Sequence, residues 1–332
     1  MISRREFVRD MAVAGAASVL GMGTEVFAAE PPPETNRIRI AQNPNNCYAP
    51  QYMAEELLRG EGFSDLQYVR VAGSASIPPA LATGAIDLSM AFSPQFVMQV
   101  DAGAPVVMLA GIHPGCQELF GSSRVRSIRD LKGRSVAVPA INSSNYAFIV
   151  SIVGHVGLDP RRDINWVVLT QEESIRQLAE DRVDALIASP PVTYEVRAKR
   201  IGNLVVNMTT DRPWSQYFCC VLAGNREFVR KNPVATKRAM RAILKGAELC
   251  ASPEPAARHL VKRGFHKNYD ITLQMLRDLP YARWREFDAE DTIRFYSLRL
   301  QEAGLIKSSP QKILAQGTDF RFLNELKKEL KA

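Results

Sequence analysis

The residues best suited to binding chemistry form a short polar turn near the middle of the chain. Residues 135–138 are apolar and predict a strand, and a helix is predicted to begin at Asn145. The turn between them ends in Asn142, Ser143 and Ser144. A helix start has unpaired backbone N–H groups and a partial positive charge, which suit a carboxylate, a sulfonate or another acceptor-rich small molecule. The same residues also suit simple capping of the helix, so binding and capping are both open for this turn.

The pattern of an apolar strand, a small polar turn and a helix recurs along the chain. It predicts a parallel sheet covered by helices, and ligands of such sheets bind beyond the carboxyl ends of the strands. The other matching strand ends are followed by Cys47-Tyr48, Ser74, Ser93 and Ser189. Each turn alone is ordinary loop chemistry. Their recurrence at equivalent positions predicts one site built from several strand ends.

Two residues in this pattern are also able to do covalent or acid–base chemistry. Cys47 stands at a predicted helix start, a position that lowers the pKa of a thiol. His113 is a candidate base for it. No carboxylate is placed by the sequence to orient His113, so binding without catalysis is the preferred interpretation and catalysis is the alternative.

The cysteines and histidines predict neither a metal site nor a bound cofactor. The five cysteines are an odd number and include the adjacent pair Cys219 and Cys220 in an apolar run. They are interpreted as buried free thiols, with a single disulfide left open. No histidine stands at ligand spacing from a cysteine or from another histidine, so no metal site is expected.

Composition indicates a soluble protein of two lobes. A length of 332 residues favours two lobes, given roughly 150 residues per domain. The 46% hydrophobic and 23% charged content is typical of globular proteins. The net charge is +7, but the basic residues are scattered and lack interleaved aromatic residues, so nucleic-acid binding is not expected.

The N-terminus predicts an export signal. Residues 3–9 resemble the twin-arginine motif through Arg4 and Arg5, with Val8 and Arg9 where other residues are commoner. A mild apolar stretch and a small-residue cleavage site follow. Residues 1–28 are interpreted as the signal and residues 29–35 as a flexible leader, which places the mature protein in a bacterial periplasm.

The order of predicted elements divides the mature chain. Strands and helices alternate from residue 37, and residues 117–121 are expected to leave the first lobe. Residues 204–208 and 217–222 are expected to lead back to it. The second lobe is thus predicted as residues 117–212, inserted in a first lobe of residues 36–116 and 213–332. From residue 226 onward the pattern is helical and predicts a C-terminal helical extension.

Three segments carry a resemblance to a known family: IDLSMAFSP (86–94), SIRDLKGRSVAVPA (127–140) and VDALIASPP (183–191). They resemble the periplasmic solute-binding proteins of nitrate/sulfonate/taurine-type ABC importers, which share their fold with pyrimidine-precursor binding and synthesis proteins. The resemblance covers residues 36–330. It implies an α/β, two-lobed periplasmic binding protein fold with two crossover strands and a solute held between the lobes.

The resemblance also implies which residues contact the solute and what receives it. The first-lobe contacts match Cys47, Tyr48, Ser74 and Ser93, and the second-lobe contacts match Asn142, Ser143, Ser144 and Ser189. His113 and Trp214 lie at the two crossovers and either wall the cleft or pack the hinge. The closed form is expected to be a monomer that docks on a membrane ABC permease.

Two further functions share this fold. One is an enzyme of the pyrimidine-precursor synthesis or desulfination type that uses Cys47 or His113. The other is a sensor partner that presents the closed form to a receptor. For the solute itself, a sulfonate, nitrate, a carboxylate and a pyrimidine all remain open.

Overall fold

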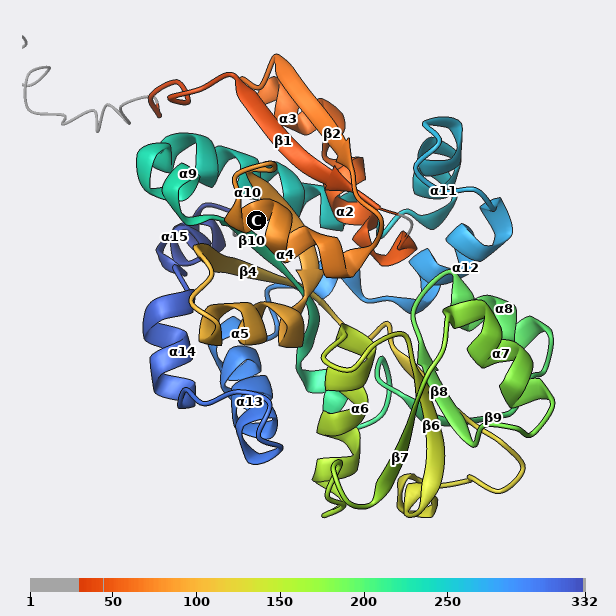
Figure 1. Cartoon of the computed structure of the whole chain (residues 1–332). Coiled ribbons are helices and arrows are strands. Elements are labelled where there is room, and N and C mark those ends of the chain that lie inside the picture. Colours follow the sequence, from red (N-terminus) through yellow and green to blue (C-terminus); the bar gives the residue numbers. More distant parts are fainter. Residues whose placement is uncertain (1–29, 44, 331–332) are drawn as a thin grey trace, which may run out of the picture. The chain divides into compact units, whose positions relative to one another are not determined.

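The computed structural model describes residues 30–43 and 45–330 (Figure 1). The chain divides after residue 32 into two units, and the second unit, residues 33–332, is compact. All the helices and strands that the structure describes lie in the second unit. The predicted signal, residues 1–28, lies outside the described residues, and so does residue 29 of the predicted leader.

The first sheet has five strands in the order β2-β1-β3-β10-β4. β1, β2 and β3 are parallel, and β10 runs antiparallel to both β3 and β4. β4 and β10 are buried along their whole length, as expected for strands covered on both faces. The strands are β1 Arg37–Gln42, β2 Asp65–Arg70, β3 Leu88–Phe92, β4 Val106–Pro114 and β10 Phe218–Asn225.

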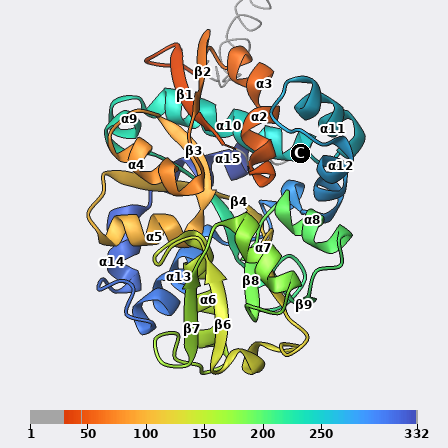
Figure 2. The ribbon, with the colours of Figure 1, turned by 45° about the vertical axis from the view of Figure 1, so that its right-hand side comes forward.

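The second sheet also has five strands, in the order β7-β6-β8-β5-β9. β6 is parallel to β7 and β8, and β5 runs antiparallel to β8 and β9. All five strands lie between β4 and β10 in the sequence, so the chain crosses between the sheets twice. The strands are β5 Glu118–Gly121, β6 Arg134–Val138, β7 Ile164–Val168, β8 Ala185–Ala188 and β9 Asn203–Asn207. Figure 2 shows β6 to β9, in yellow and green, apart from β1 to β3, in red and orange.

Short helices follow most of the strands directly. In the first lobe they are η1 Asn46–Tyr48, α2 Ala49–Met53, α3 Glu55–Gly60, η2 Ser74–Ser76, α4 Ile77–Ala82 and α5 Ser93–Asp101. In the second lobe they are η3 Ile128–Leu131, α6 Ser144–His155, α7 Gln171–Ala179 and α8 Val192–Ala198. η3 is a single 3-10 turn, closed by a capping box between Ser127 and Asp130.

The C-terminal third is helical, as predicted. Its elements, after the short η4 Trp214–Gln216 and β10, are α9 Arg226–Lys231, α10 Pro233–Leu249, α11 Pro253–Lys262, α12 Tyr269–Asp278, η5 Tyr281–Arg283, α13 Ala289–Glu302, α14 Pro310–Gly317 and α15 Arg321–Glu329. Trp284 is buried in the core, and the half-buried Phe295 stacks on Tyr217. Among the described helices, none has the length and apolar content needed to cross a membrane.

Three hydrogen bonds to one carboxylate, that of Asp184, connect strands of the second lobe. Asp184, just before β8, accepts hydrogen bonds from the backbone N–H and the hydroxyl of Ser135 in β6 and from the guanidinium of Arg124. Burial alone would raise the pKa of Asp184, but these bonds outweigh it and lower that pKa. The ionised carboxylate therefore ties β6 to β8, the two strands that carry the central polar turns of this lobe.

Replacing Asp184 by Asn should lower the free energy of unfolding at pH 7 by about 1–3 kcal/mol, because the amide cannot satisfy all three donors. The folded pKa lies below the unfolded value of about 3.9, so the carboxylate stabilises the fold above that pH and loses this effect as the pH falls through the folded pKa. Urea unfolding at pH 7 and at pH 3 measures both effects. Asp181→Asn, at an exposed position nearby, is the control. An equal loss of unfolding free energy in the two variants would contradict the stabilising role of Asp184.

Candidate functional site

Three polar turns from the two lobes meet at one place. The Asn46 backbone N–H donates to the Pro190 carbonyl at 3.2 Å, which joins the turn after β1 to the turn after β8. The Ser189 hydroxyl lies 3.5 Å from the Asn45 side-chain oxygen at the same junction. The Asn145 amide, in the first turn of α6, donates to the Ile187 carbonyl at 3.0 Å. The ends of β1 and β8 and the start of α6 are therefore neighbours.

Next to this junction, a series of aromatic rings connects the two lobes. The Tyr48 ring in η1 lies 5.7 Å from the Phe92 ring at the end of β3. The Phe92 ring lies 5.6 Å from that of Phe148 on α6, and the Phe148 ring lies 5.8 Å from that of Tyr296 on α13. Helix α6 of the second lobe thus packs directly on the first lobe, next to the polar turns.

In the central turn, the structure shows capping. The Ser143 hydroxyl accepts a hydrogen bond from the Tyr146 backbone N–H at 3.2 Å, so the capping interpretation of Ser143 is confirmed. Ser144 is the buried first residue of α6. Asn142 is exposed and has a φ of 69°, a left-handed conformation that Asn tolerates. Contact of any of the three with a solute stays a prediction.

The remaining predicted contacts are spread more widely. The buried Ser93 hydroxyl donates to the Phe218 carbonyl at 2.6 Å, which ties the end of β3 to β10. Ser74 is half-buried at the start of η2. The Trp214 ring packs 5.4 Å from the His155 ring, at the far end of the 12-residue α6. That end is roughly 16 Å along the helix axis from Ser144, so the structure does not bring Trp214 to the central turn.

Two buried donors at the junction have no hydrogen-bond partner among the described residues. They are the Tyr48 hydroxyl and the Asn43 side-chain nitrogen. The Asn43 side-chain oxygen accepts from the Asn45 backbone N–H at 2.8 Å, which orients the amide. A buried donor without a partner costs about 1–3 kcal/mol, so such groups are normally met by water or a ligand. Asn43 was not predicted, although it is the first polar residue after β1 and could have been included on that ground.

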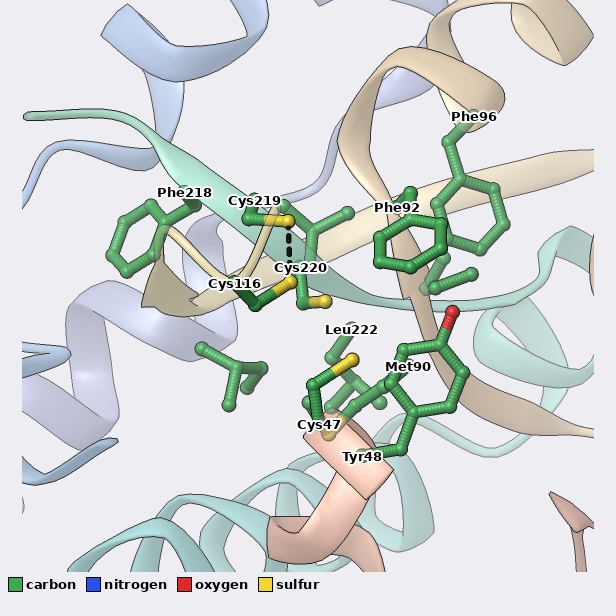
Figure 3. Packing of buried hydrophobic residues seen from close by; sticks show 14 of the residues in the cluster. Cys47, Tyr48, Met90, Phe92, Phe96, Cys116, Phe218, Cys219, Cys220 and Leu222 are labelled. Atoms are coloured by element: carbon green, nitrogen blue, oxygen red, sulfur yellow. Dashed lines mark hydrogen bonds between the residues drawn. The ribbon is translucent and has the colours of Figure 1, made fainter. Parts of the chain in front are cut away.

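A cluster of buried sulfur atoms lies beneath this junction (Figure 3). The sulfur atoms of Cys116 and Cys219 are 2.9 Å apart. One ligand atom from each of Cys47, His113, Cys116 and Cys220 lies within 4.8 Å of the others. All five cysteines are free and buried, as predicted. His113 and Cys116 stand at an H-x-x-C spacing that the prediction from the sequence missed, whereas Cys47 on η1 and Cys220 on β10 lie too far away in the sequence for spacing to link them to this pair.

Burial controls the protonation of this cluster. It raises the pKa of Cys47 well above the ordinary value, so the prediction that a helix start lowers the pKa of this thiol is wrong. The pKa of Cys116 is well below its usual range: burial alone would raise it, but neighbouring thiols, Cys219 first among them, hydrogen-bond to its thiolate. Burial lowers the pKa of His113, whose two ring nitrogens face the carbonyl oxygens of Pro114 and Cys47, each at 3.1 Å. His113 therefore bonds within the hinge and is not oriented by a carboxylate.

A polar cavity adjoins the cluster on the side of the first crossover. It has a volume of about 190 Å³ and includes Cys116, Glu118, Arg197 and Asp278 in its wall. Glu118 and Arg197 form a close ion pair there. The thiol cluster is thus next to a polar space and not enclosed by apolar side chains alone.

Comparison with known proteins supports this architecture. Residues 45–256 match the model of a family described as NMT1/THI5-like. The alkanesulfonate-binding protein SsuA from Xanthomonas axonopodis pv. citri, solved bound to MOPS, is similar with a TM-score of 0.66 at 18% identity over 85% of this chain and 96% of that chain. The nitrate-binding protein NrtA from Synechocystis PCC 6803 has a TM-score of 0.75 at 14% identity over 91% and 90%.

The sulfonate-binding protein SsuA from Escherichia coli is similar with a TM-score of 0.67 at 17% identity over 84% of this chain and 91% of that chain. No curated protein matches the chain. At these identities the structural likeness shows the fold, and the predicted two-lobed periplasmic binding protein fold is confirmed.

The bond between Asn145 and Ile187 gives a test of the junction. Asn145→Ala should lower the free energy of unfolding by about 1–3 kcal/mol, because the buried Ile187 carbonyl loses its donor. Asn165→Ala is the matched control, since the Asn165 amide also donates to a backbone carbonyl, that of Gly133, but at an exposed position. Urea unfolding of both variants measures the difference, and a larger loss in Asn165→Ala would contradict the assignment.

Proposed function

The chain belongs to the NMT1/THI5-like family, and we propose that it is the periplasmic solute-binding component of an ABC importer. The observation that carries the proposal is the junction of strand ends from both lobes, next to two buried donors, Tyr48 and Asn43, that lack a partner among the described residues. A solute with acceptor atoms would satisfy those donors and touch both lobes. Closure of the lobes would then be stabilised only when the solute is present.

The solute is proposed to be small and polar or anionic. Tyr48 and Asn43 offer donors from the first lobe. The N-terminal end of α6, with Ser143 and Ser144, offers a positive helix end from the second lobe, and Ser189 lies at the same junction. The solved proteins of similar fold include binders of alkanesulfonate and nitrate, which supports this class of solute.

The remaining parts of the proposal concern location and partners. Export through residues 1–28 would place the mature chain in the periplasm, where a membrane permease would receive the closed form. We do not propose catalysis, because burial raises the pKa of Cys47 and the ring nitrogens of His113 face carbonyl oxygens.

Ser143→Trp should block solute binding without unfolding the protein, because the bulky indole would obstruct the proposed contact at the start of α6. A thermal-shift screen with nitrate, methanesulfonate, taurine, acetate and uracil identifies the solute, since a ligand of the native state raises the melting temperature by mass action. Calorimetry on the variant should then show a loss of affinity of at least about tenfold. Ser143→Ala is the control, because it removes the same cap, worth about 1 kcal/mol, without adding bulk. Unchanged affinity in Ser143→Trp would refute this placement.

Tyr48→Phe should separate binding from stability. Removal of the unpartnered hydroxyl should leave the ligand-free protein as stable as the wild type or more stable, because a buried polar group is lost. Affinity for the solute should fall about five- to tenfold, the effect of one hydrogen bond. Tyr296→Phe is the matched control, since its hydroxyl is also buried and without a partner among the described residues but lies on α13. Equal effects of the two variants on affinity would remove Tyr48 from the site.

A further inference from the structure

We propose that the protein binds one zinc ion at the hinge through Cys47, His113, Cys116 and Cys220. These four residues offer three sulfur atoms and one imidazole nitrogen. Three cysteines and one histidine are a recurrent tetrahedral ligand set of structural zinc sites. The site is separate from solute capture and does not depend on the identity of the solute.

The distances suit a tetrahedral zinc ion. The four ligand atoms all lie within 4.8 Å of one another. Zinc–sulfur bonds of about 2.3 Å and zinc–nitrogen bonds of about 2.0 Å require ligand atoms to be roughly 3.3–3.8 Å apart. The observed group therefore needs only small side-chain adjustments to enclose the ion. Figure 3 shows the sulfur atoms of Cys47, Cys116 and Cys220 directed toward a common space.

The ligands come from parts of the chain that the fold holds in place. Cys47 lies on η1, and Cys220 and His113 are paired across β10 and β4. Cys116 lies in the first crossover with a φ of 81°, an uncommon conformation for a residue with a side chain. Four ligands from three separate segments, all buried, are a preorganised set.

His113 has a backbone contact of the kind that orients metal-binding histidines. A neutral imidazole has one N–H and one free lone pair. Its two nitrogens face the carbonyl oxygens of Pro114 and Cys47, and only one of those contacts can be a hydrogen bond. A backbone carbonyl that accepts from one ring nitrogen commonly orients a ligating histidine, and the other ring nitrogen of His113 would exchange its carbonyl contact for the ion when zinc binds.

The chemistry of the group favours zinc over magnesium, calcium and copper(I). Thiolates and imidazole are poor ligands for magnesium and calcium, which prefer oxygen. Three thiolates around Zn²⁺ leave a single net negative charge, whereas Cu⁺ would leave two in the same buried space. Cys219, with its sulfur 2.9 Å from that of Cys116, is placed to donate a hydrogen bond to the coordinated thiolate. Cys116 also forms part of the wall of the adjoining polar cavity.

A zinc ion here would act on the hinge. It would join the turn that carries Tyr48 to both crossovers, through Cys116 on one and Cys220 on the strand that follows the other. Binding to the native state alone would raise the melting temperature.

Metal titration of the reduced, full mature protein tests the proposal. Co²⁺, used as a spectroscopic substitute for Zn²⁺, should bind one ion per chain with thiolate charge-transfer and tetrahedral absorption bands, and Zn²⁺ should displace it. Cys220→Ala and His113→Ala should lose this spectrum. Cys250→Ala is the matched control, because Cys250 is also a buried free thiol but lies at the end of α10, and it should bind like the wild type. No binding by the wild type, or an unchanged spectrum in Cys220→Ala, overturns the site.

X-ray absorption on the zinc-loaded wild type keeps the test independent of how the variants fold. Three sulfur atoms and one nitrogen in the first shell support the proposal. A shell of oxygen and nitrogen, or of four sulfur atoms, overturns the ligand set. A Cys116–Cys219 disulfide in zinc-free protein isolated from its cells, detected by mass spectrometry, overturns it as well, since that bond would consume one ligand.

Discussion

The second crossover returns the chain as β10, and this strand lies between β3 and β4 in the middle of the first sheet. Because β10 is antiparallel to both neighbours, its first residues lie against the last residues of β3 and β4. The Ser93 hydroxyl strengthens this meeting by donating to the Phe218 carbonyl. Both crossovers are thereby held at the end of the sheet where the polar turns lie, and the second lobe follows from that constraint.

The sulfur cluster and the polar junction between the lobes are neighbours because the two crossovers lie close together. The ends of β4 and β10 bring His113 next to Cys220, and the turn after β1 places Cys47 over them. The next residue, Tyr48, belongs to the aromatic series that leads through Phe92 to α6. Side chains of consecutive residues in one 3-10 turn thus serve the sulfur cluster and the junction between the lobes.

Much of the fold was predictable from the sequence because it rests on local patterns. Apolar strands, polar turns and helix starts predicted the alternation that both sheets show, and residues 86–94, 127–140 and 183–191 indicated the family. The capping role of Ser143 was also readable, since Ser before an apolar helix is a common cap. In the site, the turns at Cys47-Tyr48 and Ser189 were expected to belong to one site because the resemblance implies a solute held between the lobes, and the neighbouring Asn45 does lie against Ser189.

The rest could not be predicted, because it depends on contacts between distant segments. The sulfur cluster needs the register of β10 against β4, which no spacing along the chain encodes. The protonation of Cys47 was misjudged for the same reason: position at a helix start argues for a lower pKa, but complete burial decides the outcome. For Trp214 the sequence left a place in the cleft wall and a place in the hinge open, and the structure packs its ring on His155, at the end of α6 away from Ser144.

The contacts between the lobes and the buried contacts within the hinge have different roles in the proposed closure. The hydrogen bond from Asn46 to Pro190 is a polar contact between the lobes, and it lies beside the aromatic packing of α6 on the first lobe. The sulfur cluster is fully buried within the hinge and the first lobe, where it does not have to break when the lobes part. If zinc binds as proposed, the buried cluster would hold Tyr48 in the first lobe, and the proposed solute would act on the contacts between the lobes, which include both the polar junction and the packing of α6.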